Sequence, residues 1–418
     1  MKAKMPSKTK KNLKIQARIV NQSTEQDYLK LMENLKVDLK GIRIMVPKGT
    51  LRAVYLSGVP SSSANILKQE MLSLGGEAAL PKESLFKDKT IDCLLLGTDS
   101  HLGRLIKRLN SQPYSLKESG RIIRSALDNF KKDRFVFSAS GYRIKISRPL
   151  IMGILNVTPD SFSGDGVISS NMPKRKIKSR VLERAEEMVR QGVDLIDIGG
   201  ESTRPGALSV CLREEISRVI PAVKAVHNRF KKIPLSVDTR NPETARRALD
   251  QGACIVNDIT ALSDKRMAEV VREQKAGVVL MHMRGRPKTM QRNPFYKDVV
   301  KEVYDFLSLC IEKALSFGID KSRIIVDVGF GFGKRVEDNL CLLNHLYQFK
   351  SLGCPVLAGV SRKSFIGKVL SQDDSSRRVN GTIAAETACV LKGAKILRVH
   401  DVKQAKEAVE TAYRIMSC

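Results

Sequence analysis

The stretch IMGILN, residues 151–156, is a short apolar run that ends in an asparagine, and this pattern repeats along the rest of the chain. Seven further runs follow, at residues 194–198, 235–238, 254–257, 278–281, 324–327, 356–359 and 396–399. Helical patterns fill most of the gaps, for example at residues 179–191, 242–251, 298–317 and 402–416. Eight strands that alternate with helices over about 270 residues predict an α/β fold, a (β/α)8 TIM barrel. A doubly wound open sheet is the competing interpretation.

Nearly every one of these runs ends in a side chain that can bind or react. The residues are Asn156, Asp197, Asp238, Asn257, His282, Asp327, and Arg398 with His400, and Ser-Arg-Lys-Ser follows the seventh run at 361–364. The carboxyl ends of barrel strands converge on one face, which houses the site of such proteins. The sequence therefore predicts a single pocket lined by these groups.

The first 130 residues have a different pattern. Apolar runs at 52–58 and 91–97 alternate with helical patterns at 62–74 and 116–130, which predicts a smaller α/β domain. Two apolar segments, 135–138 and 142–146, flank Ala-Ser-Gly and predict a β-hairpin. We therefore expect a basic, disordered tail at 1–14, an N-terminal α/β domain at 15–132, whose role the sequence does not reveal, and the barrel at 133–418.

The chain of 418 residues has 73 Lys and Arg against 44 Asp and Glu, a formal net charge of +29 that the sequence does not explain. The basic residues are spread along the whole chain without a zinc-finger or RNA-binding aromatic motif, so we expect no nucleic-acid partner. A scaffold whose basic N-terminal domain binds nucleic acid remains an alternative. Tight, salt-sensitive retention of nucleic acid would favour it.

Eight cysteines without a CxxC pair are typical of reduced thiols rather than of a disulfide framework or a zinc site. Residues 1–14 hold six lysines, but the apolar stretch of a secretory signal does not follow them. No run of about 18 apolar residues is present to span a membrane. We expect a cytoplasmic protein without a membrane partner.

Asp238, Asn257 and Asp327 place two carboxylates and one amide at the ends of the third, fourth and sixth runs. Carboxylates match the paired N–H donors of a guanidine-like edge, so this set suits a flat heterocycle with an amino-pyrimidinone edge. Each residue could instead cap a neighbouring helix or turn. Their equivalent positions in the barrel favour a shared ligand.

Two loops and one cationic group add to this pocket. Asn156 opens NVTPDSFSGDG, a loop that could close over a substrate, and its side-chain oxygen could hold a Mg²⁺ that also binds phosphate, an ordinary solvent loop being the alternative. In GGESTRPG, residues 199–206, Thr203 offers a hydroxyl and Arg204 a planar group for an anion. Lys363, Arg398 and His400 follow the last two runs, where such barrels bind phosphate, unless the latter two pair with acids at the rim.

The stretch GFGFGK, residues 329–334, is rich in glycine but lacks the GxxxxGK[ST] spacing of a P-loop. This difference excludes a nucleotide triphosphatase.

Eight segments, in their order along the chain, resemble the dihydropteroate synthase family. They are MGILNVTPDSF from Met152, IDIGGESTRPG from Ile196, SVDT from Ser236, VNDI from Val256, LMHMRGRPKTMQ from Leu280, DVGFGFGK from Asp327, GVSRKSFIG from Gly359 and RVHDV from Arg398. The resemblance covers about residues 134–418, including the hairpin that would close the barrel floor. It implies a transferase of folate biosynthesis, a sulfonamide target, which joins 6-hydroxymethyl-7,8-dihydropterin pyrophosphate to p-aminobenzoate and releases pyrophosphate.

The resemblance also implies roles for single residues. Asp238, Asn257, Asp327 and Lys363 would bind the pterin, Asn156 would hold Mg²⁺, and Arg398 and His400 would grip the pyrophosphate. The p-aminobenzoate pocket and its closing loops would use Phe162, Asp165, Thr203, Arg204, Pro205 and Ser364, with support from Asp197, Met281, Phe332 and Gly359. A homodimer through barrel helices is implied as well, although the sequence itself does not reveal the oligomeric state.

The chain departs from the family pattern in two places. Asp327-Val-Gly stands where Asp-Pro-Gly is common, which loosens a turn but keeps the carboxylate. SGDG stands where SDGG is frequent, which moves the loop acid to Asp165 and leaves its role open. A methyltetrahydrofolate methyltransferase would share the pterin set, but it releases no pyrophosphate and would not need Lys363, Arg398 and His400.

Overall fold

The computed structural model describes residues 17, 18, 20, 24–82, 84, 89–112, 114–159, 166–168, 174–201, 210–286 and 289–417. The chain forms two compact units, Met1–Ser125 and Ala126–Cys418. The division falls inside the helix α5 (Tyr114–Lys131), seven residues before the boundary that we expected at 132/133. Among the described residues no helix is long and apolar enough to cross a membrane.

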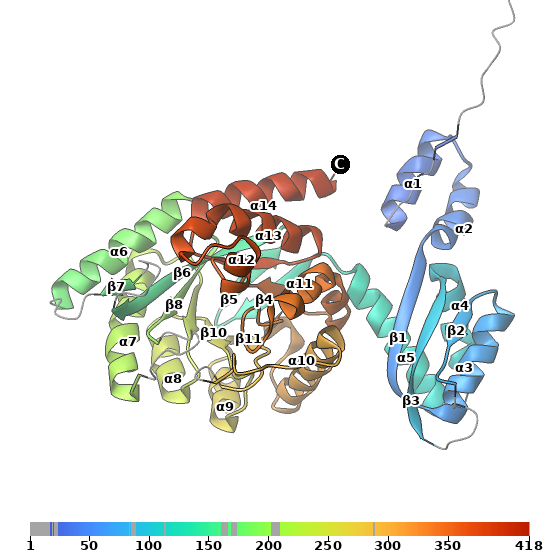
Figure 1. The fold of residues 1–418 in the computed structure, drawn as a ribbon, viewed down its shortest axis with the longest axis horizontal. Helices are drawn as coiled ribbons and strands as arrows, with labels where there is room; N and C mark the ends of the chain where they lie inside the picture. The colour runs from blue at the N-terminus through green and yellow to red at the C-terminus, as the bar shows by residue number, and fades with distance from the viewer. Residues whose placement is uncertain are drawn as a thin grey trace, which may run out of the picture. The chain divides into compact units, whose positions relative to one another are not determined.

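The first unit contains a small three-stranded antiparallel sheet with helices (Figure 1). Its elements are α1 (Glu25–Asn34), α2 (Leu39–Gly49), β1 (Leu51–Pro60), α3 (Ser61–Ser73), β2 (Glu77–Ala79), β3 (Thr90–Thr98), α4 (Asp99–Leu109) and the start of α5, and the strand order is β1-β3-β2. Alternate residues of β3, such as Cys93 and Leu95, are buried, as are Leu67 of α3 and Leu105 of α4. The alternation on the strand gives the sheet one apolar face, and the predicted smaller α/β domain is confirmed.

A β-hairpin precedes the barrel and forms its floor. The strands β4 (Phe135–Ala139) and β5 (Tyr142–Ile146) pair antiparallel, with Ser140 and Gly141 at positive φ in the turn. Phe137 is 1% exposed and belongs to a cluster with Ile255, Val279 and Ile325 from the barrel strands. The hairpin therefore plugs the interior of the barrel at one end, as predicted.

Eight parallel strands close into a barrel. They are β6 (Leu150–Pro159), β8 (Leu195–Gly199), β9 (Leu235–Asp238), β10 (Ile255–Asp258), β11 (Gly277–Met281), β12 (Ile324–Asp327), β13 (Val356–Ala358) and β14 (Ile396–Val399). Each strand pairs with its neighbour in chain order, and β14 pairs with β6. This last pairing excludes the open sheet. A short strand, β7 (Gly166–Ile168), also pairs with β6.

Helices surround the strands of this unit (Figure 1). They are α6 (Lys174–Arg190), α7 (Leu212–Arg229), α8 (Pro242–Asp250), α9 (Lys265–Glu273), α10 (Val299–Ser316), α11 (Val336–Asn344), α12 (Ser364–Val369), α13 (Val379–Leu391) and α14 (Val402–Ser417), with 3-10 turns η1 (Lys321–Arg323), η2 (Leu346–Leu352) and η3 (Ser375–Arg378). In α9, Met267, Val270 and Val271 are buried at helical spacing behind an Asp264 cap. Such amphipathic faces form the core between helices and strands.

Candidate active site

A cavity of about 560 Å³ lies at the carboxyl ends of the barrel strands. The predicted residues that line it are Asn156, Asp238, Asn257, Met281, Asp327, Phe332, Gly359, Lys363, Ser364, Arg398 and His400. Ser361 and Arg362, which follow the seventh predicted run, also line it, and so do residues that the sequence reasoning missed, among them Glu201, Asp373, Asp374 and Arg378. The convergence of strand ends on one pocket is the geometry expected of a barrel.

Arg398 joins two acids in the depth of this cavity. Its Nε donates to Oδ2 of Asp197 at 2.6 Å, and its Nη2 donates to Oδ2 of Asp238 at 2.7 Å. Asn257 donates from Nδ2 to the same Asp197 oxygen at 3.1 Å. Asp197 is fully buried and lies behind the cavity wall, so it holds Arg398 and Asn257 in place. Arg398 therefore pairs with acids inside the barrel rather than with Asp401 at the rim.

The charges of this cluster are strongly perturbed. Burial raises the pKa of Asp238 to about 7, although Arg398 opposes the rise. Burial lowers the pKa of Arg398, but Asp197 and Asp238 outweigh this effect and raise it overall. The Oδ1 atoms of Asp197 and Asp238 are buried and have no hydrogen-bond partner among the described residues. A buried acceptor without a donor is costly, so Oδ1 of Asp238, in the cavity wall, suits a ligand N–H group.

Asp327 and Lys363 form a second pair of opposite charges in the wall. Asp327 is 5% exposed, accepts from the backbone N–H of Gly329 at 2.8 Å, and has a pKa that burial raises. The Lys363 Nζ lies 4.2 Å from the centre of the Phe332 ring. A cation over an aromatic face is stabilised electrostatically, so Phe332 orients the lysine.

Two ties connect the loops after β13 and β14. The Nδ1 atom of His400 lies 3.1 Å from Oγ of Ser361, which also accepts from the His400 backbone N–H. Arg362 forms a bidentate ion pair with Asp401. Its Nη2 donates to Oδ1 at 2.6 Å and its Nε donates to Oδ2 at 2.9 Å. Arg362 has a φ of 55°, which an L residue seldom adopts. These ties place Lys363 and His400 in a defined relation to each other.

The first two barrel loops are described only in part. Phe162, Asp165, Thr203, Arg204 and Pro205 lie outside the described residues. The residues that flank the second loop are described. Glu201 accepts from Arg240 at 3.0 Å and from the backbone N–H of Val210 at 3.3 Å. The Glu201 carboxylate therefore connects Val210 and Arg240.

His282 follows β11 as predicted, but it is not among the residues that line the cavity. It is 6% exposed and its Nδ1 lies 2.9 Å from Nζ of Lys334. Burial, and then the nearby Lys334, lower the pKa of His282 to about 2. A neutral imidazole at this position accepts a hydrogen bond, and the adjacent Met281 lines the cavity in its place.

The described residues contain no cluster of three His, Cys, Asp or Glu that could hold a metal ion by themselves. A Mg²⁺ that keeps water and phosphate ligands needs fewer protein atoms. Oδ1 of Asn156 and Oδ2 of Asp238 both lie 3.8 Å from the position that a Cβ at Gly199 would take, and Oδ2 of Asp238 already accepts from Arg398. The residues present thus fit a cation that takes one protein oxygen, from Asn156, besides water and phosphate.

The family described as "Pterin binding enzyme" matches residues 152–400, which include the cavity residues and all of the barrel strands except the first two residues of β6. Fold and site therefore define this chain as a pterin-binding barrel enzyme. The dihydropteroate synthase of Escherichia coli (strain K12) is 43% identical over 279 residues, covering 67% of this chain and 96% of that relative. That of Haemophilus influenzae is 46% identical over 259 residues. The chain belongs to the dihydropteroate synthase family.

Solved structures agree with this assignment. The Yersinia pestis dihydropteroate synthase with a sulfonamide drug has a TM-score of 0.64 and 40% identity, and covers 68% of this chain and 100% of that chain. The Xanthomonas albilineans enzyme in complex with 7,8-dihydropteroate has a TM-score of 0.60 and 38% identity. This protein is accordingly a transferase of folate biosynthesis that forms 7,8-dihydropteroate from a pterin pyrophosphate and p-aminobenzoate.

One relative extends beyond the barrel. A "Probable bifunctional folylpolyglutamate synthase/dihydropteroate synthase" of Halobacterium salinarum is 38% identical over 381 residues, 91% of this chain and 45% of that relative. This share is larger than residues 126–418 can supply, so the match continues into the N-terminal unit.

Proposed function

We propose that the cavity at the barrel mouth carries out this condensation, with the pterin bound to its buried acids and the pyrophosphate held by its cations. One observation carries the proposal. Asp238 has one carboxylate oxygen paired with Arg398 and one buried oxygen with no partner among the described residues, in a wall that also holds Asp327 and Lys363. Such a wall offers acceptors to a heterocycle and positive charge to a leaving group in one enclosed space.

The pterin has amino and ring N–H donors and ring acceptors. Asp238 and Asn257 are 8% and 4% exposed and would accept and donate hydrogen bonds at one edge of the pterin. Asp327 and Lys363 would accept and donate at the other edge. Met281 and Phe332 supply apolar contact for the flat ring, while Gly359 leaves room for it. Asp197 acts indirectly, because it orients Asn257 and Arg398.

The pyrophosphate would lie toward His400 and Arg398, with Ser361 bonded to the histidine ring. Asn156 would contribute its side-chain oxygen to Mg²⁺, which supplies neutralisation of the charge that develops on the leaving pyrophosphate. Ser364, at the cavity wall, would contact p-aminobenzoate together with Phe162, Thr203, Arg204 and Pro205, and Asp165 is the proposed loop acid.

The reaction needs no protein nucleophile. The bond from the methylene carbon to the pyrophosphate oxygen breaks with its electron pair, the amine nitrogen of p-aminobenzoate bonds to that carbon, and the nitrogen then loses a proton. The electron-rich pterin stabilises positive charge on the methylene, so bond breaking runs ahead of attack. The residues of the cavity orient the two substrates, neutralise charge and exclude water.

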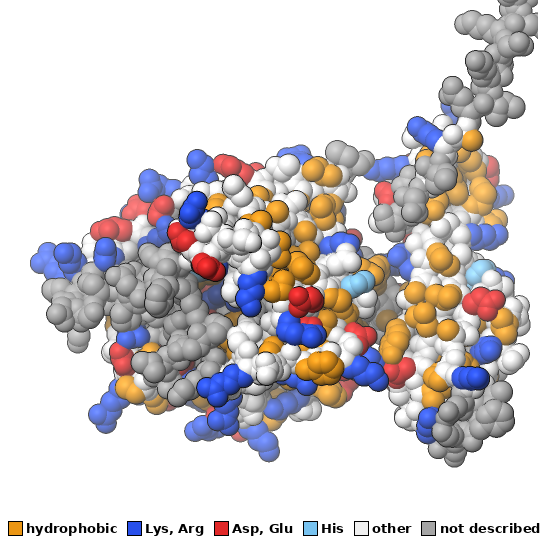
Figure 2. All heavy atoms as spheres, in the orientation of Figure 1, with side chains coloured by type: hydrophobic (Ala, Val, Ile, Leu, Met, Phe, Trp, Pro, Cys, Tyr) orange, Lys and Arg blue, Asp and Glu red, His pale blue; other side chains and the backbone are white. Residues whose placement is uncertain are grey.

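We also propose a homodimer that forms through the barrel helices, and a cytoplasmic location. Figure 2 shows hydrophobic side chains at the surface over α13 and α14, where Leu391, Ile415 and Met416 are 47%, 65% and 52% exposed. An exposed apolar patch of this kind supports a protein contact. The seven cysteines that the structure describes are free thiols, which supports a reducing compartment.

The test is an assay of 7,8-dihydropteroate formation from both substrates with Mg²⁺, comparing the wild type with Lys363→Ala and Asp238→Ala. Both variants should lose activity by at least about a hundredfold, since each removes a charged contact to the pterin. Lys403→Ala, at an exposed position of α14, is the control and should be fully active. Circular dichroism checks that all variants are folded. Inactivity of the wild type with authentic substrates would reject the proposal.

A further inference from the structure

The glycine-rich loop between β12 and α11 is held by side chains from two neighbouring elements. Gly329, Gly331 and Gly333 all have positive φ, between 62° and 78°. A Cβ at Gly329 would lie 1.9 Å from the carbonyl oxygen of His282, and one at Gly333 would lie 2.3 Å from that of Arg284. The loop therefore packs so closely against the loop after β11 that no side chain fits at these positions.

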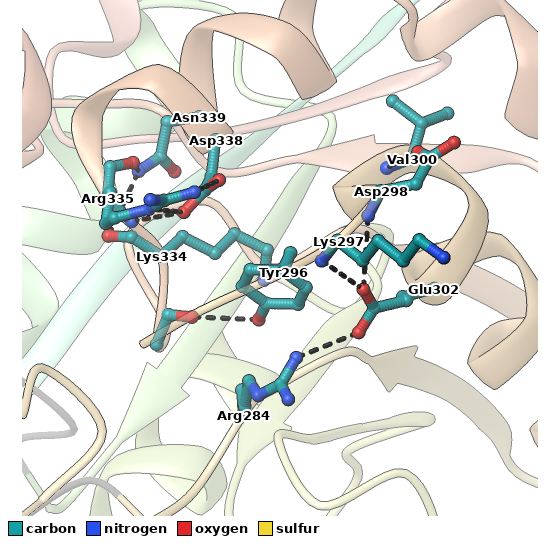
Figure 3. A network of polar contacts seen from close by, with 11 residues as sticks. Arg284, Tyr296, Lys297, Asp298, Val300, Glu302, Lys334, Arg335, Asp338 and Asn339 are labelled. Atoms are coloured by element: carbon teal, nitrogen blue, oxygen red, sulfur yellow. Dashed lines mark hydrogen bonds and ion pairs between the residues drawn. The ribbon is translucent and has the colours of Figure 1, made fainter. Parts of the chain in front are cut away.

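Side chains satisfy the backbone of this loop at several points. Tyr296 donates to the Gly333 oxygen at 2.8 Å, Gln291 donates to the Gly331 oxygen at 2.6 Å, and Asn339 accepts from the Gly331 N–H at 2.7 Å. Figure 3 shows Tyr296 on one side of the loop and Asn339 of α11 on the other. A backbone bonded in this way has one defined conformation.

Lys334 makes the innermost of these contacts. Its Nζ lies 2.9 Å from the Gly329 oxygen, 3.2 Å from the Phe332 oxygen and 2.9 Å from Nδ1 of His282. The side chain is 3% exposed, burial lowers the pKa of Lys334 to about 7, and the protonated amine has three N–H groups for these three contacts. Figure 3 shows the side chain of Lys334 turned back into the protein, while Arg335 pairs with Asp338.

The loop supports Lys363 of the cavity. The Phe332 ring lies 4.2 Å from Nζ of Lys363, and a Cβ at Gly331 would come within 3.2 Å of the Lys363 side chain. The first residues of the loop also position Asp327, which accepts from the Gly329 N–H. Lys334 thus contacts the carbonyl groups of the two residues, Gly329 and Phe332, that touch the proposed pterin groups.

We propose that Lys334 is a positioning residue for pterin binding, which orients Lys363 by fixing Phe332 in the glycine-rich loop. The proposal rests on the pterin role given above to Lys363. It also assigns a use to His282, whose Nδ1 lies 2.9 Å from Nζ of Lys334. A lysine that merely stabilised the barrel would affect both substrates alike, whereas a positioning residue affects the pterin alone.

The experiment measures KM for each substrate, and the binding of 6-hydroxymethylpterin by calorimetry, in the full chain. Lys334→Met keeps the length of the side chain but removes its donors, and should raise the pterin pyrophosphate KM by roughly tenfold or more while the p-aminobenzoate KM stays within about twofold. Arg335→Met is the matched control, because this neighbouring cation is half exposed and pairs only with Asp338 among the contacts in Figure 3. It should leave both KM values unchanged.

A double-mutant cycle that combines Lys334→Met with Phe332→Ala tests whether Lys334 affects pterin binding through Phe332. If Lys334 acts through Phe332, the double variant should bind 6-hydroxymethylpterin no more than about threefold more weakly than the weaker single variant. Additive losses, or equal changes in the two KM values, would overturn the proposal.

Should Lys334→Met fail to fold, Gln291→Ala decides. The Gln291 side chain is exposed, and its truncation removes the hydrogen bond to the Gly331 oxygen. We expect a rise of about threefold in the pterin KM alone. An unchanged pterin KM would contradict the proposal. If the wild type forms no dihydropteroate, the proposed function fails, while calorimetry still decides whether Lys334 governs pterin binding.

Discussion

Arg398 donates from Nη2 to Oδ2 of Asp238 at 2.7 Å, and the other oxygen of this carboxylate is buried and unpaired among the described residues. Only one of the two carboxylate oxygens of Asp238 therefore has a hydrogen-bond donor among the described residues. Its pKa of about 7 reflects burial that the single arginine contact does not fully offset. Folding therefore favours the protonated form of Asp238, whereas the proposed substrate binding favours the ionised form, and both effects can be measured.

Pterin binding should depend on pH through Asp238. In the proposed site the ionised carboxylate would accept hydrogen bonds from pterin N–H groups, and this form prevails above a pH of about 7. We expect kcat/KM for the pterin substrate to fall as the pH drops below that value, by about tenfold per pH unit at the limit. The measurement is a pH profile at saturating p-aminobenzoate, repeated as direct binding of 6-hydroxymethylpterin, which lacks the ionising pyrophosphate. A flat binding profile between pH 5.5 and 8, taken as an approximate range, would contradict this assignment.

Stability should show the opposite dependence on pH. The folded-state pKa of Asp238, about 7, lies above the ordinary value of 3.8, so folding favours the protonated form. The contribution of this group is fully present below pH 3.8 and is lost as the pH rises to about 7. We expect Asp238→Asn to be inactive yet more stable than the wild type at pH 8, by roughly 2 kcal/mol. Urea unfolding at pH 4.5 and 8 tests this, and a gain of equal size at both values would exclude the mechanism.

Removal of the arginine should be far more damaging to the fold. Arg398→Met leaves Asp197 and Asp238 buried without their cation, and we expect a loss of about 3–5 kcal/mol in the free energy of unfolding. Adding Asp238→Asn to this variant removes one uncompensated charge and should restore part of the loss. Denaturant midpoints of the two variants provide the comparison. A double variant less stable than Arg398→Met would show that the charges are not the cause.

Magnesium should act on the leaving group and depend on Asn156. Chelation of divalent ions should abolish dihydropteroate formation, and Asn156→Ala should raise the Mg²⁺ concentration for half-maximal activity by roughly tenfold, because one oxygen ligand is lost. Binding of 6-hydroxymethylpterin should change little in either case. Titration of activity with MgCl₂ after dialysis against chelator makes the measurement. Full activity without divalent ions would remove Asn156 from this role.

The floor of the barrel should matter for stability alone. Phe137→Ala removes a ring that is 1% exposed from the cluster beneath the strands, which should cost about 3–5 kcal/mol. Because the hairpin lies at the opposite end of the strands from the cavity, kcat and both KM values should stay within about twofold. Val136→Ala, at a 42% exposed position of the same strand, is the control for stability.

The barrel could be predicted because each strand is a separate apolar run bounded by polar residues. The predicted bounds of β9, β12 and β14 agree with the structure, since a polar residue follows the last apolar one in each. In α6 the helix begins at Lys174 rather than 179, since its first turns are basic and carry little apolar periodicity. The N-terminal helix α1 could not be predicted for a similar reason, because it buries no side chain.

Site residues at strand ends could be predicted, and residues that join loops could not. Asp238, Asn257 and Asp327 occupy equivalent positions that the rhythm of the chain reveals. Glu201, Arg362 and Lys334 contact Arg240, Asp401 and His282, which lie far along the sequence, and no local pattern predicts such contacts. Arg398 was expected beside the pyrophosphate, and its ion pairs reach Asp197 of β8 and Asp238 of β9, strands that do not neighbour β14 and that only the closed barrel brings within its reach.

The hairpin floor has a consequence for the order of events. Phe137 and its neighbours fill one end of the barrel, and among the described residues the cavity lies at the other end, where the strands have their carboxyl ends. A compound that binds the deepest acids must therefore enter before a compound that binds nearer the surface. Under the proposed assignment, a pterin at Asp238 and Asp327 would therefore bind before p-aminobenzoate, and the product would leave at the end of the barrel where the substrates enter.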